Sequence, residues 1–231
     1  MENDRGYLVC QAGIARELAT TNKQKGNEMR FGLKILGSMA AAAAASSAVA
    51  APPVDKAYIR SLATPGKTVL VVEYYDGQSR VVDRKGYASS NGYKAASATE
   101  IRVDQKLSLR LFGIEPCAGD MVNRKENYTG SCSDFARHGL TTLLQSPRVI
   151  LCRAFLAEQQ AQVQDATCYG YYNFPGSLDS VDMFEEQLVS LGSHRIARKT
   201  DGSPARPELM EAEKIGRSGY GMWADPRIKG Q

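Results

Sequence analysis

Residues 107–115 (Leu-Ser-Leu-Arg-Leu-Phe-Gly-Ile-Glu) constrain the fold of this chain more than any other segment. Apolar and polar side chains alternate along them, which is the pattern of a strand with one buried face and one exposed face. Arg110 falls on the polar face, and Glu115 falls at the end of the segment. The segment therefore predicts a half-buried strand that carries two opposite charges and needs a sheet to pair with.

Residues 29–50 have the features of a signal peptide. A basic start is followed by an apolar, alanine-rich run, and Ala-Val-Ala at 48–50 precedes a helix-breaking Ala-Pro-Pro. A buried helix or a membrane anchor is the alternative, although an anchor needs about 20 strongly apolar residues and this run contains glycine and serine. We expect export and cleavage, which leaves residues 1–28 as an upstream mis-start or a disordered tail.

The predicted mature part, residues 51–231, is long enough for one domain with its own core. Residues 1–50 hold 6 of the 29 basic and 4 of the 25 acidic residues, which leaves 23 against 21. A balance this even lacks the clustered excess of Lys and Arg expected of a nucleic-acid-binding surface. Composition alone therefore favours no particular partner.

Four of the five cysteines, Cys117, Cys132, Cys152 and Cys168, lie in the predicted mature part. An even number in an oxidising compartment predicts two disulfides, for which three pairings exist. We favour Cys117–Cys132, which would pin the loop after the key strand, and Cys152–Cys168, which would join two neighbouring strands. No Cys-x-x-Cys pair is present, so a zinc site is not favoured.

The order of elements predicts a mainly β chain with helices (α+β). Residues 51–96 are expected to form a β-hairpin with an Asp-Gly turn at 76–77, followed by a glycine- and serine-rich linker from 84. Residues 97–227 are expected to form a five-stranded OB-fold barrel packed with about three helices. Four of its strands are predicted at 100–103, 107–114, 148–156 and 166–172, with a polar loop at 116–132 and helices beginning at 133, at 179 or 180, and at 208.

Two stretches resemble the staphylococcal-nuclease-like (thermonuclease) family. That family has a strand ending in Arg-Leu-x-Gly-Ile-Asp-x-Pro-Glu and a last helix of the form Glu-Ala-x-x-x-x-Gly-x-Gly-x-Trp. Residues 110–118 match the first pattern in part, and residues 211–223 resemble the second, with Trp223 as an aromatic anchor. The resemblance covers roughly residues 97–227 and implies the OB fold. It also implies a phosphodiesterase that uses calcium, two arginines and a glutamate near the attacking water.

Several residues that this chemistry needs are missing. Arg110 matches the first phosphate arginine, and Glu115 stands where the family has a calcium-binding Asp. Ala118 replaces the glutamate near the attacking water, and residues 97–100 lack the calcium aspartate of the family's Asp-Gly-Asp-Thr loop. The second arginine falls at about 162–164, where none is present. The resemblance thus implies a degraded catalytic set of Arg110 and Glu115, with Glu115 as its metal ligand.

Other readings of these residues remain open. Arg110 could instead form a structural ion pair with Glu115 or Glu100. Carboxylates of the disulfide loop could rebuild a metal site beside Glu115; the candidates are Asp120, Glu126 and Asp134. A nucleophilic pair of Cys132 and His138 is disfavoured because an exported cysteine is more often in a disulfide. His194 follows the end of the second helix and is expected to be a helix-end or surface residue.

Four aromatic residues cluster on and after one strand: Tyr169, Tyr171, Tyr172 and Phe174. Alternation places Tyr169 and Tyr171 on one face and the other two on the opposite face, so half of them belong to the core. OB barrels stack bases or sugar rings on such residues. Tyr169 and Tyr171 are therefore the candidate ligand platform.

Three functions follow as hypotheses. The first is a non-catalytic or weakly active exported protein, periplasmic or secreted, that works in a polysaccharide pathway. Its overall design also resembles the nuclease-like protein encoded in succinoglycan (acidic exopolysaccharide) biosynthesis clusters, which implies a role in exopolysaccharide production. The second is a calcium-dependent nuclease; otherwise no cofactor is expected. The third is a binder of anionic polysaccharide or nucleic acid that uses Arg110, Arg148, Arg153 and the tyrosines. No membrane span is expected in the mature protein.

Overall fold

The computed structural model describes residues 54–174, 176 and 178–229. The predictions for residues 1–28 and for the signal peptide at 29–50 lie outside these described residues. In the part that is described, no helix is long and apolar enough to cross a membrane.

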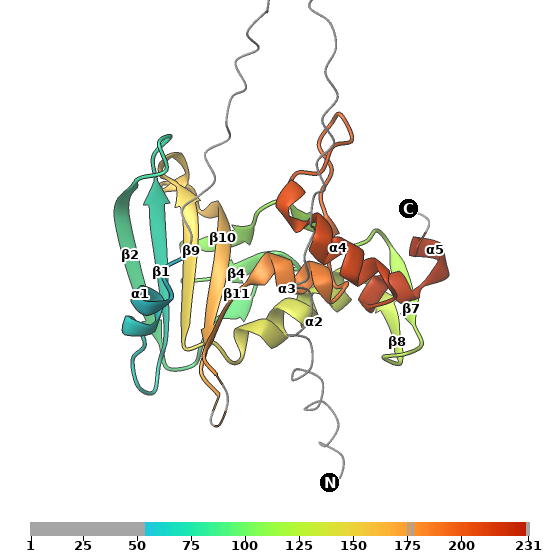
Figure 1. Cartoon of the computed structure of the whole chain (residues 1–231), viewed down its shortest axis with the longest axis horizontal. Helices are drawn as coiled ribbons and strands as arrows, with labels where there is room; N and C mark the ends of the chain where they lie inside the picture. The colour runs from blue at the N-terminus through green and yellow to red at the C-terminus, as the bar shows by residue number, and fades with distance from the viewer. Residues whose placement is uncertain (1–53, 175, 177, 230–231) are drawn as a thin grey trace, which may run out of the picture. The chain divides into compact units, whose positions relative to one another are not determined.

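One large mixed sheet organises the domain (Figure 1). Two of its neighbouring pairs are parallel, β1 with β9 and β5 with β10, and the others are antiparallel. β10 has β9 along one edge, while its other edge pairs first with β5 and then with β11. The strand order is β2 (Val81–Ser89), β1 (Thr68–Tyr75), β9 (Val149–Phe155), β10 (Val163–Tyr172), β5 (Ser108–Leu111), β4 (Glu100–Arg102) and β3 (Lys94–Ala95), with β11 (Ser180–Met183) beside β10.

The predicted N-terminal hairpin is present, and it is longer than expected. Asp76 begins the turn, where its carboxylate accepts the backbone N–H groups of Gln78 and Arg80. β2 continues to Ser89, and β3 lies at 94–95, so the prediction of an unbroken linker from 84 was wrong. The polar composition reflects an edge strand, because β2 pairs with no described strand other than β1 and polar side chains suit such a position.

A closed barrel is not confirmed. β2 and β3 are the two ends of the strand order, and no ladder joins them within the described residues. The sheet nevertheless encloses one main core, because Leu70 and Val72 of β1 belong to the same buried cluster as Ile101 of β4 and Leu109 of β5. The domain is thus α+β with a large mixed sheet.

The described residues form five α-helices beside the sheet: α1 (Lys56–Ser61), α2 (Cys132–Leu144), α3 (Phe184–Ser190), α4 (Met210–Arg217) and α5 (Pro226–Lys229). Figure 1 shows α2, α3 and α4 beside one another, and buried residues of all three join the main core. Ile59 of α1 packs against Val71 and Leu151 in a separate cluster, because alternate residues of β1 and β9 point to opposite faces.

The second predicted helix begins later than expected. Residues 180–183 form β11 instead, pairing with Tyr169 to Tyr172 of β10, and the helix starts at Phe184. Val181 fits both patterns, so the apolar spacing could not separate a strand from a helix at this boundary.

The predicted polar loop at 116–132 contains a hairpin, β7 (Asp120–Asn123) and β8 (Tyr128–Ser131). Met121 of this hairpin packs with Trp223, which is buried as the predicted aromatic anchor and lies in the 3-10 turn η3 (Gly221–Ala224). The guanidinium of Arg217, at the end of α4, lies 4.0 Å from the centre of the indole ring. The chain's end therefore covers this hairpin.

Gly192, the expected stop of the second helix, allows a close backbone approach. Its φ is +69°, and a Cβ placed there would lie 2.3 Å from the carbonyl oxygen of Tyr220. Gly202 has a similar φ of +80° but open space around the same position. A side chain at Gly202 would therefore meet only backbone strain, whereas one at Gly192 would meet both strain and a steric clash.

We predict that Gly202→Ala lowers the free energy of unfolding by about 1–2 kcal/mol, the cost of the left-handed conformation alone. Gly192→Ala should cost on the order of 3 kcal/mol or more, because the methyl group also displaces the 220–222 backbone. Urea denaturation of both variants checks this. Equal losses would show that the approach of Gly192 to Tyr220 is unimportant.

Candidate functional site

The key segment 107–115 bends at Gly113, and its two halves pair with different strands. β5 precedes the bend, and β6 (Ile114–Glu115) follows it and pairs with β12 (Arg195–Ile196). Gly113 has a φ of +74°, and a Cβ there would lie 2.4 Å from the side chain of Arg206. The single long strand that alternation predicts is therefore two short strands separated by a glycine turn.

Arg110 forms an ion pair with Asp165 of β10. The parallel register of β5 and β10 places the two residues opposite each other, and Arg110 Nε lies 2.6 Å from Asp165 Oδ1. Hydrogen bonding to this carboxylate raises the pKa of Arg110 above its usual value. Glu100 is the cross-strand neighbour of Arg110 on β4, but the ion pair is with Asp165. The alternative of a structural ion pair is therefore correct in kind, and its two named partners, Glu115 and Glu100, are wrong.

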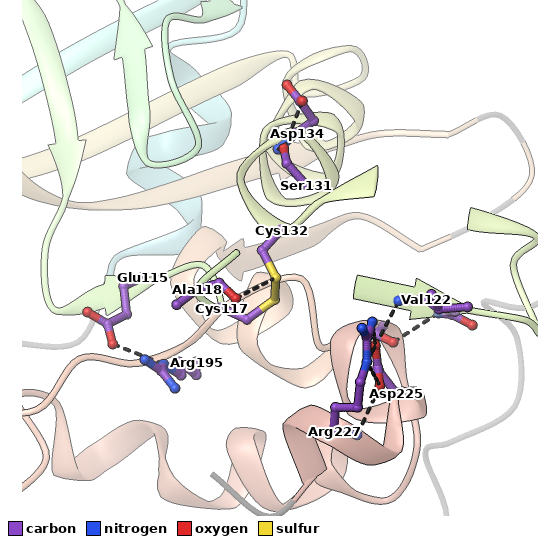
Figure 2. The surroundings of a disulfide bond; sticks show 12 residues. Glu115, Cys117, Ala118, Val122, Ser131, Cys132, Asp134, Arg195, Asp225 and Arg227 are labelled. Atoms are coloured by element: carbon purple, nitrogen blue, oxygen red, sulfur yellow. Dashed lines mark hydrogen bonds and ion pairs between the residues drawn. A yellow bond between two sulfur atoms is a disulfide. The ribbon is translucent and has the colours of Figure 1, made fainter. Parts of the chain in front are cut away.

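Glu115 is also paired, with Arg195 on the adjacent strand. Arg195 Nε donates to Glu115 Oε1 at 2.9 Å, as Figure 2 shows. The β6–β12 register places the two residues directly opposite each other. Each charge of the candidate catalytic pair is thus balanced by a separate partner.

The loop after Glu115 is fixed by the favoured disulfide, Cys117–Cys132, whose Cα atoms lie 5.3 Å apart (Figure 2). Cys132 is the first residue of α2, and Ser131 caps this helix by accepting the N–H of Asp134. Ala118 is exposed beside the disulfide and contributes only a methyl group where the resemblance implies a glutamate.

The loop carboxylates have local partners. Asp134 accepts from Ser131 and forms an ion pair with Arg137, and Glu126 accepts from the side chain of Asn123. Asp120 lies exposed on β7. Across the described ranges, no group of three or more His, Cys, Asp or Glu side chains could hold a metal ion.

Asp225 fixes the same hairpin from the C-terminal side. Its buried carboxylate accepts the backbone N–H of Val122 at 2.8 Å and forms an ion pair with Arg227, as Figure 2 shows. Hydrogen bonds from the Arg227 guanidinium hold the pKa of Asp225 well below its usual value. The carboxylate therefore acts as a structural tie between β7 and the chain's end.

A buried ionic group that the sequence did not reveal lies where β10 passes from β5 to β11. Glu185, fully buried in the first turn of α3, accepts the Cys168 N–H at 3.3 Å. Arg206 is also buried; its Nη1 lies 3.8 Å from Glu185 and donates to the Phe112 carbonyl at 3.0 Å. Glu185 thus binds an N–H of β10 at a position that pairs with β9 but with neither β5 nor β11.

Burial raises the pKa of Glu185 from 4.5 to about 7, although the nearby Arg206 cation opposes the shift. Arg206 also forms an ion pair with Glu208. Glu185 lies among the apolar residues of a core-facing helix, and no sequence motif distinguished it from a surface glutamate. Glu185 and Arg206 together link α3 to the carbonyl of Phe112, which follows the end of β5 and precedes Gly113.

The second favoured disulfide, Cys152–Cys168, joins β9 to β10. Cys132 is in the first disulfide, and His138 is exposed on α2, so the disfavoured Cys-His pair does not form. His194 follows the end of α3, as expected, but its side chain is fully buried and does not lie at the surface.

Two hydrogen bonds explain the burial of His194. Its Nε2 donates to the Ala98 carbonyl at 2.9 Å, and its Nδ1 lies 3.0 Å from the hydroxyl of Ser193. Desolvation lowers the pKa of His194 to about 4, so the ring is neutral and ties the end of α3 to the loop at 97–100.

The aromatic residues divide between the two faces as alternation predicted. Tyr169 and Tyr171 belong to the cluster beside α1, whereas Tyr172 is in the main core. Tyr171 is buried and donates to Asp179. Tyr169 lines a surface pocket of about 540 Å³ between β11, α3 and α4.

Of the basic residues named from the sequence, Arg153 is largely buried near the Tyr75 and Tyr169 rings, with its guanidinium carbon 5.4 Å and 5.7 Å from their centres. Its Nε also lies 3.6 Å from the Glu73 carboxylate. Arg148, in contrast, is exposed at the start of β9. The described chain therefore separates Arg110, Arg148 and Arg153 into three environments.

Comparisons with known proteins add no relative: no family model matches the chain, and no curated protein matches it closely enough to be one.

The raised pKa of Glu185 predicts a pH dependence of stability. The folded state holds the proton more tightly than the unfolded state, so this contribution is complete below about pH 4.5 and is lost as the pH rises through about 7. Glu185→Gln cannot ionise. Relative to the parent, its free energy of unfolding should therefore increase over this window, by on the order of 3 kcal/mol in total.

Urea denaturation at intervals from pH 5 to pH 8 measures the effect. Glu186→Gln, which changes the exposed neighbour, is the matched control and should follow the parent at each pH. A parent and a Glu185→Gln variant with parallel pH profiles would contradict the assignment.

Proposed function

We propose that this chain is an exported thermonuclease-like protein that has lost phosphodiester cleavage and acts in acidic exopolysaccharide (succinoglycan) biosynthesis. The observation that carries the loss of cleavage is the pairing of Arg110 with Asp165 and of Glu115 with Arg195. A phosphate would have to displace Asp165 from the arginine, and a cation would have to displace Arg195 from the carboxylate.

The position of Asp165 supports this proposal further. The resemblance implies a second phosphate arginine near residues 162–164, close to the part of β10 that lies beside β5. The charged residue there is an aspartate, which repels a phosphate. Ala118 supplies no base, and loss of a general base alone slows such reactions by roughly 10² to 10⁴.

The OB fold is part of the same proposal. We assign β3, β4, β5, β9 and β10 to the five-stranded OB-type unit and the hairpin β1–β2 to an N-terminal addition placed beside β9. The parallel pairing of β1 with β9 supports this division, because it places the predicted hairpin at one edge of the sheet, next to β9. Export is supported by the two disulfides, which persist in oxidising compartments.

The alternative, a calcium-dependent nuclease, is tested by digestion of DNA with purified protein. We expect no release of acid-soluble nucleotides with calcium present, and no change when a chelator is added. Asp165→Asn removes the negative charge beside the Arg110 guanidinium and should still give no turnover, because the base is absent. An active calcium-dependent nuclease serves as the positive control.

Calcium-dependent turnover that Arg110→Ala abolishes would overturn the loss of cleavage. The pathway is tested separately by deleting the gene in its own host and measuring secreted acidic polysaccharide. We expect a loss of polymer that the parent restores and that Arg110→Ala restores equally well. Unchanged polymer in the deletion strain would refute the role in biosynthesis.

A further inference from the structure

A second pocket lies at one end of the large sheet, away from Arg110 and Glu115. The registers place the starts of β1 and β9 beside the ends of β2 and β10, so four connecting segments meet at this end. The pocket between them has a volume of about 390 Å³, which suits a small ligand or one or two units of a polymer. Its lining includes Lys67, Ser90, Gln145, Arg148, Asn173 and Phe174.

Among the described residues, two cations in this lining have no ionic partner. Lys67 and Arg148 are both exposed, and neither side chain forms an ion pair or hydrogen bond with any residue that the structure describes. No Asp or Glu is among the described residues of the lining. This contrasts with Arg110, Arg195 and Arg206, each of which is matched to a carboxylate.

The remaining lining combines an aromatic ring with neutral polar groups. Phe174 is 45% exposed, and its ring lies nearly parallel to that of Tyr172, with centroids 6.0 Å apart. The core residue Tyr172 thus supports one side of an exposed ring. Amides and hydroxyls surround it, among them Asn173, Gln145 and Ser90.

This set of groups matches the chemistry of an acidic sugar. A carboxylate accepts charge-assisted hydrogen bonds from Lys and from the fork of Arg. Amides and hydroxyls bind sugar hydroxyls, and the polarised C–H groups of a sugar ring pack against the negative face of an aromatic ring. Nucleic acid needs a longer basic track with several stacking residues, and this pocket offers two cations and one exposed ring.

We infer that this pocket binds an acidic saccharide unit, with its carboxylate between Lys67 and Arg148 and its ring against Phe174. The inference rests on the proposed role in acidic exopolysaccharide biosynthesis and names the recognition site for that role. It requires no catalysis and no residue of the Arg110–Glu115 region.

Isothermal titration of the purified chain tests this, with a hyaluronan tetrasaccharide as the acidic probe and cellotetraose as its neutral counterpart. We expect binding of the acidic probe that weakens as salt is added, and weaker or no binding of the neutral probe. Lys67→Ala combined with Arg148→Ala should weaken acidic binding at least tenfold. Phe174→Ala should weaken it with the salt dependence unchanged, since it removes no charge.

Lys199→Ala combined with Arg102→Ala removes the same charge from exposed positions outside the pocket and should leave affinity unchanged. Thermal unfolding of each variant confirms folding, which we expect because all the changed side chains are exposed. An equal loss in this control pair, no binding of the acidic probe, or tighter binding of single-stranded DNA with the same dependence on Lys67 and Arg148 would each overturn the inference. None of these three outcomes bears on the polymer loss expected of the deletion strain. The binding site and the role in biosynthesis can therefore be refuted independently.

Discussion

The fold depends on how β10 shares its hydrogen bonds. One edge of this strand is covered by β9, while the other changes partner from β5 to β11, and Cys168 lies at the change. Its sulfur bonds to Cys152 on one side, and its N–H donates to the buried Glu185 on the other. Because an unsatisfied buried N–H is costly, the helix that supplies Glu185 is held against the sheet at this point. Arg206, which lies beside Glu185, also donates to the Phe112 carbonyl just after the end of β5.

The sequence predicted features that depend on local pattern. The hairpin at 68–83, strands β9 and β10, the helix predicted from 133 (α2, Cys132–Leu144), the buried Trp223 and both disulfides were expected and are present. Long-range pairing was not predictable in this way. The ion-pair partners of Arg110 and Glu115 are set by strand register between segments 55 and 80 residues apart, and one sequence carries no direct record of register. Glu185 and His194 were missed because burial of a charged or titratable residue follows from packing alone.

The distribution of charge separates two regions of this domain. In the region around residues 110–118, each candidate charge forms an ion pair with a residue of a neighbouring strand: Arg110 with Asp165 and Glu115 with Arg195. At the end of the sheet where β1 and β9 begin, Lys67 and Arg148 have no such partner in the part of the chain that the structure describes. A charge held by a neighbour has little left to offer a ligand, whereas an unpaired one keeps its full attraction. The second region is therefore better suited to recognition, although the first carries the family resemblance.

The parallel pairing of β1 with β9 also sets the order in which the chain can fold. β1 lies between β2, its immediate successor in the chain, and β9, which begins 81 residues after β1 does. Until residues 149–155 are available, the first hairpin is a two-stranded ribbon, which is marginally stable in water. Because the main core also takes Cys168 from β10 and Leu188 from α3, its formation likewise waits for the second half of the domain.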